Sequence, residues 1–291
     1  MILNKKIWSW AIYDWANSAF SCTIVAGFFP IFFEKFWSNP DDVIQSTFQL
    51  GIANSASSII IAILSPILGA IADRGSARKK FLFTFAFLGV AMTSSLCFLN
   101  QGQWQLAIVV YILASIGFMG GNIFYDSLIV SVSNDENRNR VSALGYSLGY
   151  LGGGLLFVLN VLMFLNPQWF GIESESQAVL ISFLTVAIWW SLFSIPIFRN
   201  VSESALTINQ LNFFETLVKS FNEVYQTLKE IRKYKNVAIF LLAYWFYMDG
   251  IDTIVRMATA YGSDIGLETS SMITALILTQ FVGFPSTLIF G

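Results

Sequence analysis

Three ionisable residues lie close together within one long apolar run of the sequence: Asp249, Asp252 and Arg256. At about 100° per residue of an α-helix they fall within about 60° of arc, so they form one polar stripe. A charged side chain at the centre of a bilayer costs about 2.5–3.5 kcal/mol on insertion scales, and such residues mark solute and proton pathways. The structural alternative is a self-neutralising pair, because Asp252 and Arg256 are four residues apart.

A similar stripe lies in the first apolar run, 235 residues earlier. There, Asp14, Asn17, Ser18 and Ser21 correspond to Asp249, Asp252, Thr253 and Arg256. Two halves related by an axis normal to the membrane would place these two runs face to face across a central cavity. The sequence therefore predicts a substrate or proton pathway lined by Asp14, Asn17, Ser21, Asp249, Asp252 and Arg256.

Several other kinds of chemistry are excluded by composition. The sequence has no His and two Cys, Cys22 and Cys97, both inside apolar runs. This rules out a His-ligated metal, a Ser-His-Asp triad, a disulfide framework and a Cys zinc cluster. The net charge of −2 provides no basic field for a nucleic acid, and no P-loop signature for a nucleotide occurs. We therefore expect no enzyme activity, no cofactor and no nucleic-acid partner.

The elements that carry these residues are predicted to be membrane helices. Charged residues make up 12% of the 291 residues, about half the share in a soluble protein, and mean hydropathy is +0.64. About 20 apolar residues in a helix span a bilayer, and lipid leaves no water to satisfy an open backbone. Eight segments qualify: 8–33, 50–72, 81–99, 104–126, 141–165, 178–198, 237–261 and 269–290. The predicted fold class is an all-α integral membrane protein.

The connections between these segments predict the orientation. On the N-terminal side lie Lys5, Lys6, Arg74, Arg78, Lys79, Lys80, Arg138, Arg140, Arg199, Lys219, Lys229, Arg232, Lys233 and Lys235. The other side has only Lys35, and the remaining base, Arg256, is inside a span. Basic connections stay in the cytoplasm, so we expect a cytoplasmic N-terminus. The membrane would be the bacterial cell membrane, or a vacuole-type membrane in a eukaryote.

The longest connection, 199–236, separates two groups of spans. Its apolar residues recur every three or four positions, which predicts an amphipathic helix on the cytoplasmic membrane surface. The predicted division is a six-span bundle at 1–198, this linker at 199–236, and two further spans at 237–291.

Glycines cluster in the fifth span, at Gly145, Gly149 and 152–154. A phosphate-binding loop would need a preceding strand, which the pattern lacks. Small residues allow membrane helices to approach each other closely, so we interpret this cluster as a packing face.

The loop between the second and third spans resembles the loop signature of the major facilitator superfamily. The matching residues are Gly69, Asp73, Arg74, Arg78 and Lys79, and Ser76 stands where the signature has a second Gly. The resemblance implies that these residues hold the cytoplasmic helix ends in one conformation of a transport cycle. It also implies a helical bundle of the major facilitator type.

Several polar strings within apolar runs narrow the resemblance. Residues 10–20, 28–33, 140–145, 149–153, 247–253 and 280–285 are similar to the autophagy-related vacuolar effluxer-like family of that superfamily. Asp126, in the fourth span, is interpreted as a polar contact at the cytoplasmic end. The resemblance implies efflux of small solutes, with amino acids as the best candidate, from one side of the lipid bilayer to the other.

The end of the sequence repeats an earlier pattern. Residues 287–291 correspond to 65–69, directly before the loop signature. A second half needs six spans and two are present, so the sequence predicts part of a twelve-span transporter, truncated after the eighth span. The leading hypothesis is a secondary transporter, with protons as a candidate coupling ion. The alternatives are a non-transporting membrane sensor or scaffold on a transporter fold and, third, a membrane enzyme that uses Asp249 and Asp252 as paired carboxylates.

Overall fold

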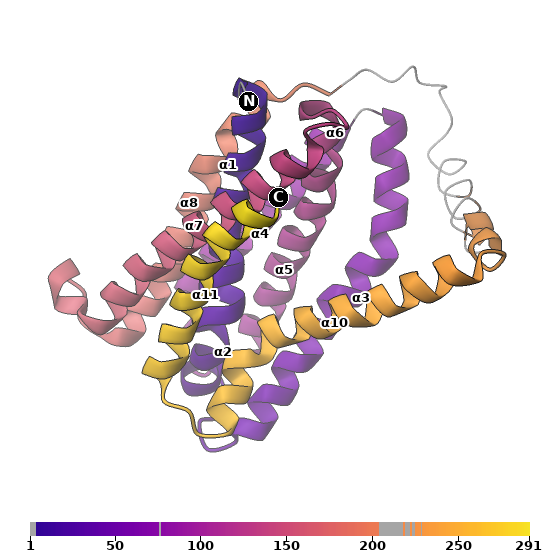
Figure 1. The fold of residues 1–291 in the computed structure, drawn as a ribbon. Helices are drawn as coiled ribbons and strands as arrows, with labels where there is room; N and C mark the ends of the chain where they lie inside the picture. The colour runs from indigo at the N-terminus through magenta and orange to yellow at the C-terminus, as the bar shows by residue number, and fades with distance from the viewer. Residues whose placement is uncertain (1–3, 76, 204–217, 219–221, 223–224, 228) are drawn as a thin grey trace.

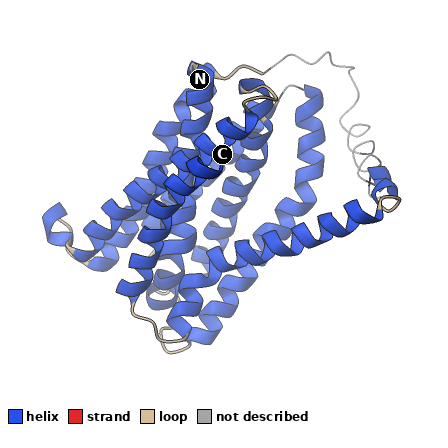
Figure 2. Cartoon of the chain, viewed as in Figure 1, coloured by secondary structure: helices blue, strands red, loops and turns tan. Residues whose placement is uncertain are grey.

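The computed structural model describes residues 4–75, 77–203, 218, 222, 225–227 and 229–291, with the backbone alone at 70–75. Within these ranges the chain is built of helices joined by short loops, and no strand occurs (Figure 2). The predicted all-α class is confirmed.

Eight of the described helices are long and apolar enough to cross a membrane, in agreement with the eight predicted spans. The first combines α1 (Lys5–Ala19), η1 (Phe20–Phe28), α2 (Phe29–Phe32) and η2 (Phe33–Trp37). The others are α3 (Val43–Gly75), α4 (Arg78–Ser95) with η3 (Leu96–Phe98), α5 (Trp104–Ser127) with α6 (Ile129–Val132), α7 (Arg138–Leu165), α8 (Glu175–Asn200), α10 (Lys235–Asp264) and α11 (Thr269–Phe290). The short η4 (Pro167–Phe170) lies between α7 and α8.

The first helix departs from regular α geometry in its second half. Phe20–Phe28 and Phe33–Trp37 are π-helical, so the backbone bonds reach five residues back. For example, the Ser38 N–H donates to the Phe33 carbonyl at 2.8 Å. The hydropathy pattern predicts the span but gives no signal for this widening. Long π segments are rare and occur frequently at functional sites.

Helix α1 lies at the centre of the core, packed against α7 and α8. Glycines of α7 allow this approach. A Cβ atom at Gly149 would lie 2.6 Å from Ser18 Oγ, and one at Gly152 would lie 2.7 Å from the Trp15 carbonyl oxygen. Both distances are too short for a real side chain, so the predicted packing role of this glycine cluster is confirmed.

Helices α10 and α11 are placed differently. Helix α11 lies along α7, whereas α10 leaves the bundle at a steep angle (Figure 1). Large apolar side chains of α10, such as Phe240, Trp245 and Ile254, are exposed. The division at 1–198, 199–236 and 237–291 stays a prediction. Most of the expected amphipathic linker helix falls outside the described residues.

The two ends of the bundle differ in the elements they contain. The N-terminus, the start of α4 and the end of α8 lie at one end, which we call the N-terminal end. The turn between α10 and α11 lies at the opposite end, near the start of α3 (Figure 1).

Candidate functional site

The first candidate site is a cavity of about 410 Å³ between α1, η1, α5, α7, α10 and α11, which we call the central cavity. This volume is typical of small-molecule sites. Its polar lining consists of Asp14, Ser18, Ser21, Asn122, Tyr146, Tyr150, Thr279 and Gln280. Apolar side chains such as Phe118 and Leu276 complete the wall.

Asp14 is the one charged side chain among the described residues that line the central cavity. Its Oδ1 accepts a hydrogen bond from Ser18 Oγ at 3.2 Å. A Cβ atom at Gly149 would lie 3.1 Å from Asp14 Oδ2, so the glycine of α7 makes the room that this carboxylate occupies. With one hydroxyl as its side-chain donor and no cation among the described lining residues, the Asp14 carboxyl group is available to a cationic group or a proton.

Asn17 lies beside the central cavity rather than in its lining. It is almost fully buried, and its Nδ2 donates to Asn122 Oδ1. Asn122 lines the cavity, so Asn17 orients a lining residue across the α1–α5 contact. Ser21, by contrast, lines the cavity directly.

The polar stripe of α10 faces a second cavity, of about 370 Å³, which we call the α3–α10 cavity. It is lined from α10 by Asp249, Asp252, Thr253, Arg256 and Met257, and from α3 by Gly51, Asn54, Ser55, Ser58 and Ile59. Arg256 Nε donates to Asp252 Oδ2 at 2.7 Å. The side chain of Arg256 is 11% exposed and that of Asp252 is 55% exposed. The ion pair between Asp252 and Arg256, which the sequence offered as the structural alternative to a pathway role, is therefore present.

The two polar stripes do not line one common cavity. In the central cavity α10 contributes Ile254, Val255 and Ala258, none of which belongs to its acidic stripe. A small pocket of about 30 Å³ lies between the two cavities. It shares Ser21, Phe118 and Val255 with the central cavity, and Asp252 and Arg256 with the α3–α10 cavity. The predicted residues thus form two groups separated by one layer of side chains, because α10 turns its stripe toward polar side chains of α3.

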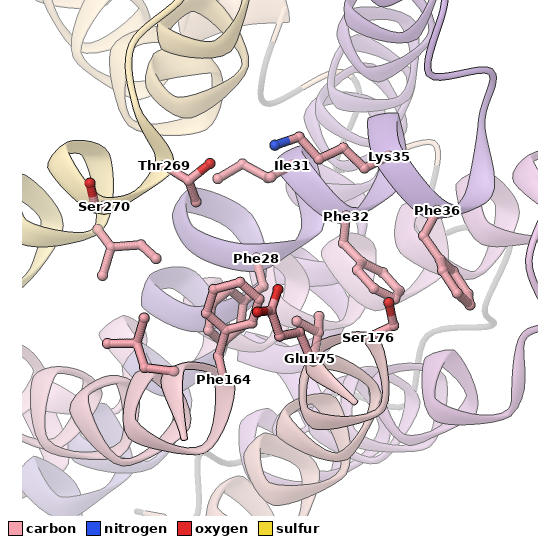
Figure 3. A pocket seen from close by; sticks show the side chains of 13 residues that line it. Phe28, Ile31, Phe32, Lys35, Phe36, Phe164, Glu175, Ser176, Thr269 and Ser270 are labelled. Carbon is pink, nitrogen blue, oxygen red and sulfur yellow. The ribbon is translucent and has the colours of Figure 1, made fainter. Parts of the chain in front are cut away.

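A third cavity, of about 400 Å³, lies at the end of the bundle opposite the N-terminus; we call it the outer cavity. Figure 3 shows Lys35 from η2, Glu175 from the start of α8 and Thr269 from the start of α11 around one space. Its walls are aromatic and include Phe28, Phe32, Phe36 and Phe164. The outer cavity was not predicted from the sequence.

The aromatic ring of Phe28 lies between the outer and the central cavity along the first helix. Phe28 lines the outer cavity, and Ala26, two residues earlier, lines the central one. The Phe28 ring lies 5.6 Å from that of Phe157 and 5.8 Å from that of Phe164, both on α7. Phe28 is 4% exposed, so its ring fills the contact between η1 and α7.

The predicted gating loop is described only in part. Gly69 lies in α3 with open space around it, and the side chains of Asp73 and Arg74 lie outside the described residues. Arg78 Nη1 donates to the Ser127 carbonyl at 3.3 Å, at the end of α5. Lys79 Nζ donates to two carbonyls at the end of α8. Asp126, beside Ser127, is exposed at the N-terminal end of the bundle.

Some lining residues were missed by the sequence interpretation. Asn122 is a polar residue inside an apolar span, so the criterion that selected Asp14 could have found it. Asn54 offers the same signal, and it accepts a hydrogen bond from the Tyr111 hydroxyl at 2.8 Å. Tyr146 offers none, because an amphipathic aromatic residue in a membrane helix faces cavity, core or interface equally well.

Comparison with known proteins decides the family. The model of the family described as "Vacuole effluxer Atg22 like" matches residues 43–291, most of the chain. The chain belongs to this Atg22-like family. A relative from Bacillus subtilis (strain 168), "Uncharacterized MFS-type transporter YxiO", is 40% identical over 290 residues, which cover 99% of this chain and 67% of the relative. No solved structure matches the chain.

Eukaryotic members of the Atg22-like family are more distant. Autophagy-related protein 22 of Saccharomyces cerevisiae (strain S288c) is 22% identical, and that of Candida glabrata is 21% identical. Each alignment covers 95% of this chain, but 65% and 64% of the respective yeast protein. The chain therefore spans about two thirds of the length of these three relatives.

Proposed function

We propose that this protein is a secondary transporter that moves a small solute across a membrane by alternating access, with Asp14 as its main binding group. The observation that carries the proposal is the placement of Asp14: a carboxylate in a cavity of about 410 Å³, with no cation among the described lining residues. Such a costly group in a membrane helix marks a pathway by default. The names of the relatives, an MFS-type transporter and vacuolar effluxers, support the same function, and not that of an enzyme.

Amino acids are the proposed solutes, moved in the direction of efflux. A zwitterion needs an anionic and a cationic partner. Asp14 would take the ammonium group in the central cavity, together with Ser21 and with Asn122 held by Asn17. Arg256 lies behind Ser21, Phe118 and Val255, and it would take the carboxylate if it left Asp252. Asp249 would keep the α3–α10 cavity acidic.

Protons are the proposed coupling ions. A carboxylate in a low-dielectric cavity can exchange a proton for a bound cation, so Asp14 can alternate between the two. The proposed topology has the N-terminus and the predicted gating residues Asp73 and Arg74 in the cytoplasm, because the order of the predicted spans assigns fourteen of the sixteen basic residues to that side. The membrane would be the cell membrane of a bacterium or a vacuole-type membrane of a eukaryote.

The test is solute flux in proteoliposomes that contain the whole protein. A panel of labelled amino acids is offered with and without a proton gradient. We expect flux of at least one amino acid, and its loss in Asp14→Asn by about 100-fold or more, since removal of a charged partner from a desolvated site costs several kcal/mol. Asp41→Asn, an exposed carboxylate in the loop after η2, is the matched control and should match the wild type. Folded wild-type protein that moves no solute of the panel would instead indicate a sensor or scaffold.

A further inference from the structure

The end of α8 and the start of α4 are joined by reciprocal contacts between charged side chains and backbone groups. The Glu203 carboxylate accepts hydrogen bonds from the backbone N–H of Arg78 at 3.0 Å and of Lys79 at 2.7 Å. In return, Lys79 Nζ donates to the carbonyl oxygens of Phe198 at 3.0 Å and Val201 at 2.6 Å. We call this pair of contacts the α4–α8 clamp.

Both contacts match the polarity of the helix ends. The first N–H groups of a helix have no partner within it, and the N-terminus carries a partial positive charge. The N-cap residue of α4 is Ala77, which has no side-chain acceptor, so Glu203 supplies the missing one from 125 residues away along the chain. Lys79 places its ammonium group on the negative end of α8. Such charge-assisted bonds are about twice as strong as neutral ones.

Helix α1 adds two further contacts at the same place. Lys6 Nζ donates to Ser202 Oγ at 3.2 Å, and Asn200 Nδ2 donates to Ser9 Oγ at 2.9 Å. Val201, between them, is 1% exposed. Residues 200–203, where the predicted linker begins, are therefore held by both α1 and α4.

We propose that Glu203 is a positioning residue for transport, which fixes the first residues of the 199–236 connection to the start of α4. This inference rests on the proposed alternating-access function. Alternating access moves one group of helices against the other, and the connection between them must transmit or absorb that motion. With the clamp closed, α1, α4, α8 and the connection up to Glu203 move as one body. The start of α4, which follows the predicted gating residues Asp73 and Arg74 at the end of α3, is then moved together with α8.

Glu203 can act as a cap, which only stabilises the N-terminus of α4, or as a tether, which also joins the 199–236 connection to α4. Different variants of this chain distinguish the two roles. Glu203→Ala removes both the cap of α4 and the tether. Ala77→Asp places a carboxylate at the N-cap position of α4 itself, which restores a cap without restoring the tether. The experiment compares Glu203→Ala, Ala77→Asp and the double variant for melting temperature, turnover and KM of transport in the whole protein.

For a tether, we expect Glu203→Ala to lower turnover by about tenfold with KM within twofold of the wild type. The double variant should regain the melting temperature and still turn over slowly. Recovery of turnover in the double variant would show that Glu203 only caps α4, and would overturn the proposal. Wild-type transport is measured first. If the wild type transports no solute, the proposed function is contradicted. If the double variant regains wild-type turnover, only this inference is contradicted.

Lys79→Met provides a second route if Glu203→Ala yields too little protein. It keeps the Glu203 cap, which uses backbone N–H groups, and removes the ammonium contacts to Phe198 and Val201. Lys80→Met, at the exposed neighbouring position, is the matched control. We expect slower turnover with unchanged KM in Lys79→Met alone, and equal turnover in both variants would overturn the proposal.

Discussion

Asp14 and Asp252 are both carboxylates inside apolar helices, yet their surroundings differ. Asp14 lies in the central cavity with one hydroxyl donor, Ser18, and no base in the described lining. Asp252 is more than half exposed and has an ion pair with Arg256 at 2.7 Å. The comparison teaches that the cost of a charge in a membrane helix identifies a candidate, and that its partners decide what the charge is free to do. Asp14 has unused capacity to bind a ligand, whereas Asp252 is largely satisfied within its own helix.

The packing around α1, which carries Asp14, also differs from that around α10, which carries Asp252. Helix α1 is enclosed by α7 and α8, and its close approach to α7 depends on glycines without side chains. Helix α10 is exposed along most of its length. A binding group must be held in a fixed position, and the packing of α1 against α7 and α8 holds Asp14 in this way.

The largest effect should come from filling the α1–α7 contact. Gly152→Leu would place its Cβ 2.7 Å from the Trp15 carbonyl oxygen, which is backbone and cannot move aside. We expect loss of monodisperse protein in size-exclusion chromatography, since overpacking costs 1–3 kcal/mol or more even at milder sites. Gly250→Leu, on α10 with no atom within 4 Å, is the control and should keep its yield. Equal yields of the two variants would contradict the difference drawn between α1 and α10.

Next in size is the contrast between two carboxylates. Asp14→Asn should abolish transport while the melting temperature stays near that of the wild type, because the amide still accepts from Ser18 Oγ. Asp249→Asn should lower flux less, since Asp249 is exposed in the α3–α10 cavity. Initial rates of uptake at several solute concentrations distinguish the two. If Asp249→Asn is the more severe variant, the main binding group belongs to the α3–α10 cavity instead.

A moderate effect is expected at the ring between the central and outer cavities. Phe28→Ala removes a ring packed on Phe157 and Phe164 and should open the contact between η1 and α7. We expect the leak of preloaded solute from proteoliposomes without a gradient to rise several-fold, because a barrier lower by about 1 kcal/mol raises a rate by that much. Phe36→Ala, which removes a ring from the outer cavity alone, is the control. If Phe28→Ala leaks no more solute than the wild type, the outer cavity is not part of the solute path.

The smallest effect should be that of the α10 ion pair on stability. Because Asp252 is 55% exposed, the pair contributes about 1 kcal/mol or less. Asp252→Asn and Arg256→Gln should each lower the melting temperature slightly, and the double variant should lie close to either single one. A double-mutant cycle of melting temperatures measures this coupling. A raised KM for amino acids in Arg256→Gln with unchanged stability would indicate that Arg256 binds the solute carboxylate.

The helices were predictable because their signal is local. A run of apolar residues determines a span whatever lies around it, and each of the eight predicted spans overlaps a long helix of the structure. The contact between Asp14 and Gly149 was not predicted, because the strings that carry the family resemblance do not indicate which of their residues touch.

The orientation of α10 and the partners of Lys79 were not predictable in the same way. Periodicity shows that Asp249, Asp252 and Arg256 share a face, but not that this face meets α3 rather than α1. The basic residues of a loop are counted for topology, yet nothing local indicates that Lys79 reaches the end of α8 or that Glu203 caps α4. Both depend on helices brought together over more than a hundred residues.

The π-helical stretch at Phe20–Phe28 has a consequence for how this helix tolerates changes in length. A π turn is the form that an α-helix takes when it holds an extra residue without breaking. Deleting one residue there would let the widened turn relax to α geometry, so the segments on either side of it would keep about the same orientation relative to each other. Lys35 would then still face the outer cavity while Asp14 faces the central one. This helix should therefore tolerate the loss of one residue within 20–28 better than within Lys5–Ala19, where everything that follows would rotate by about 100°.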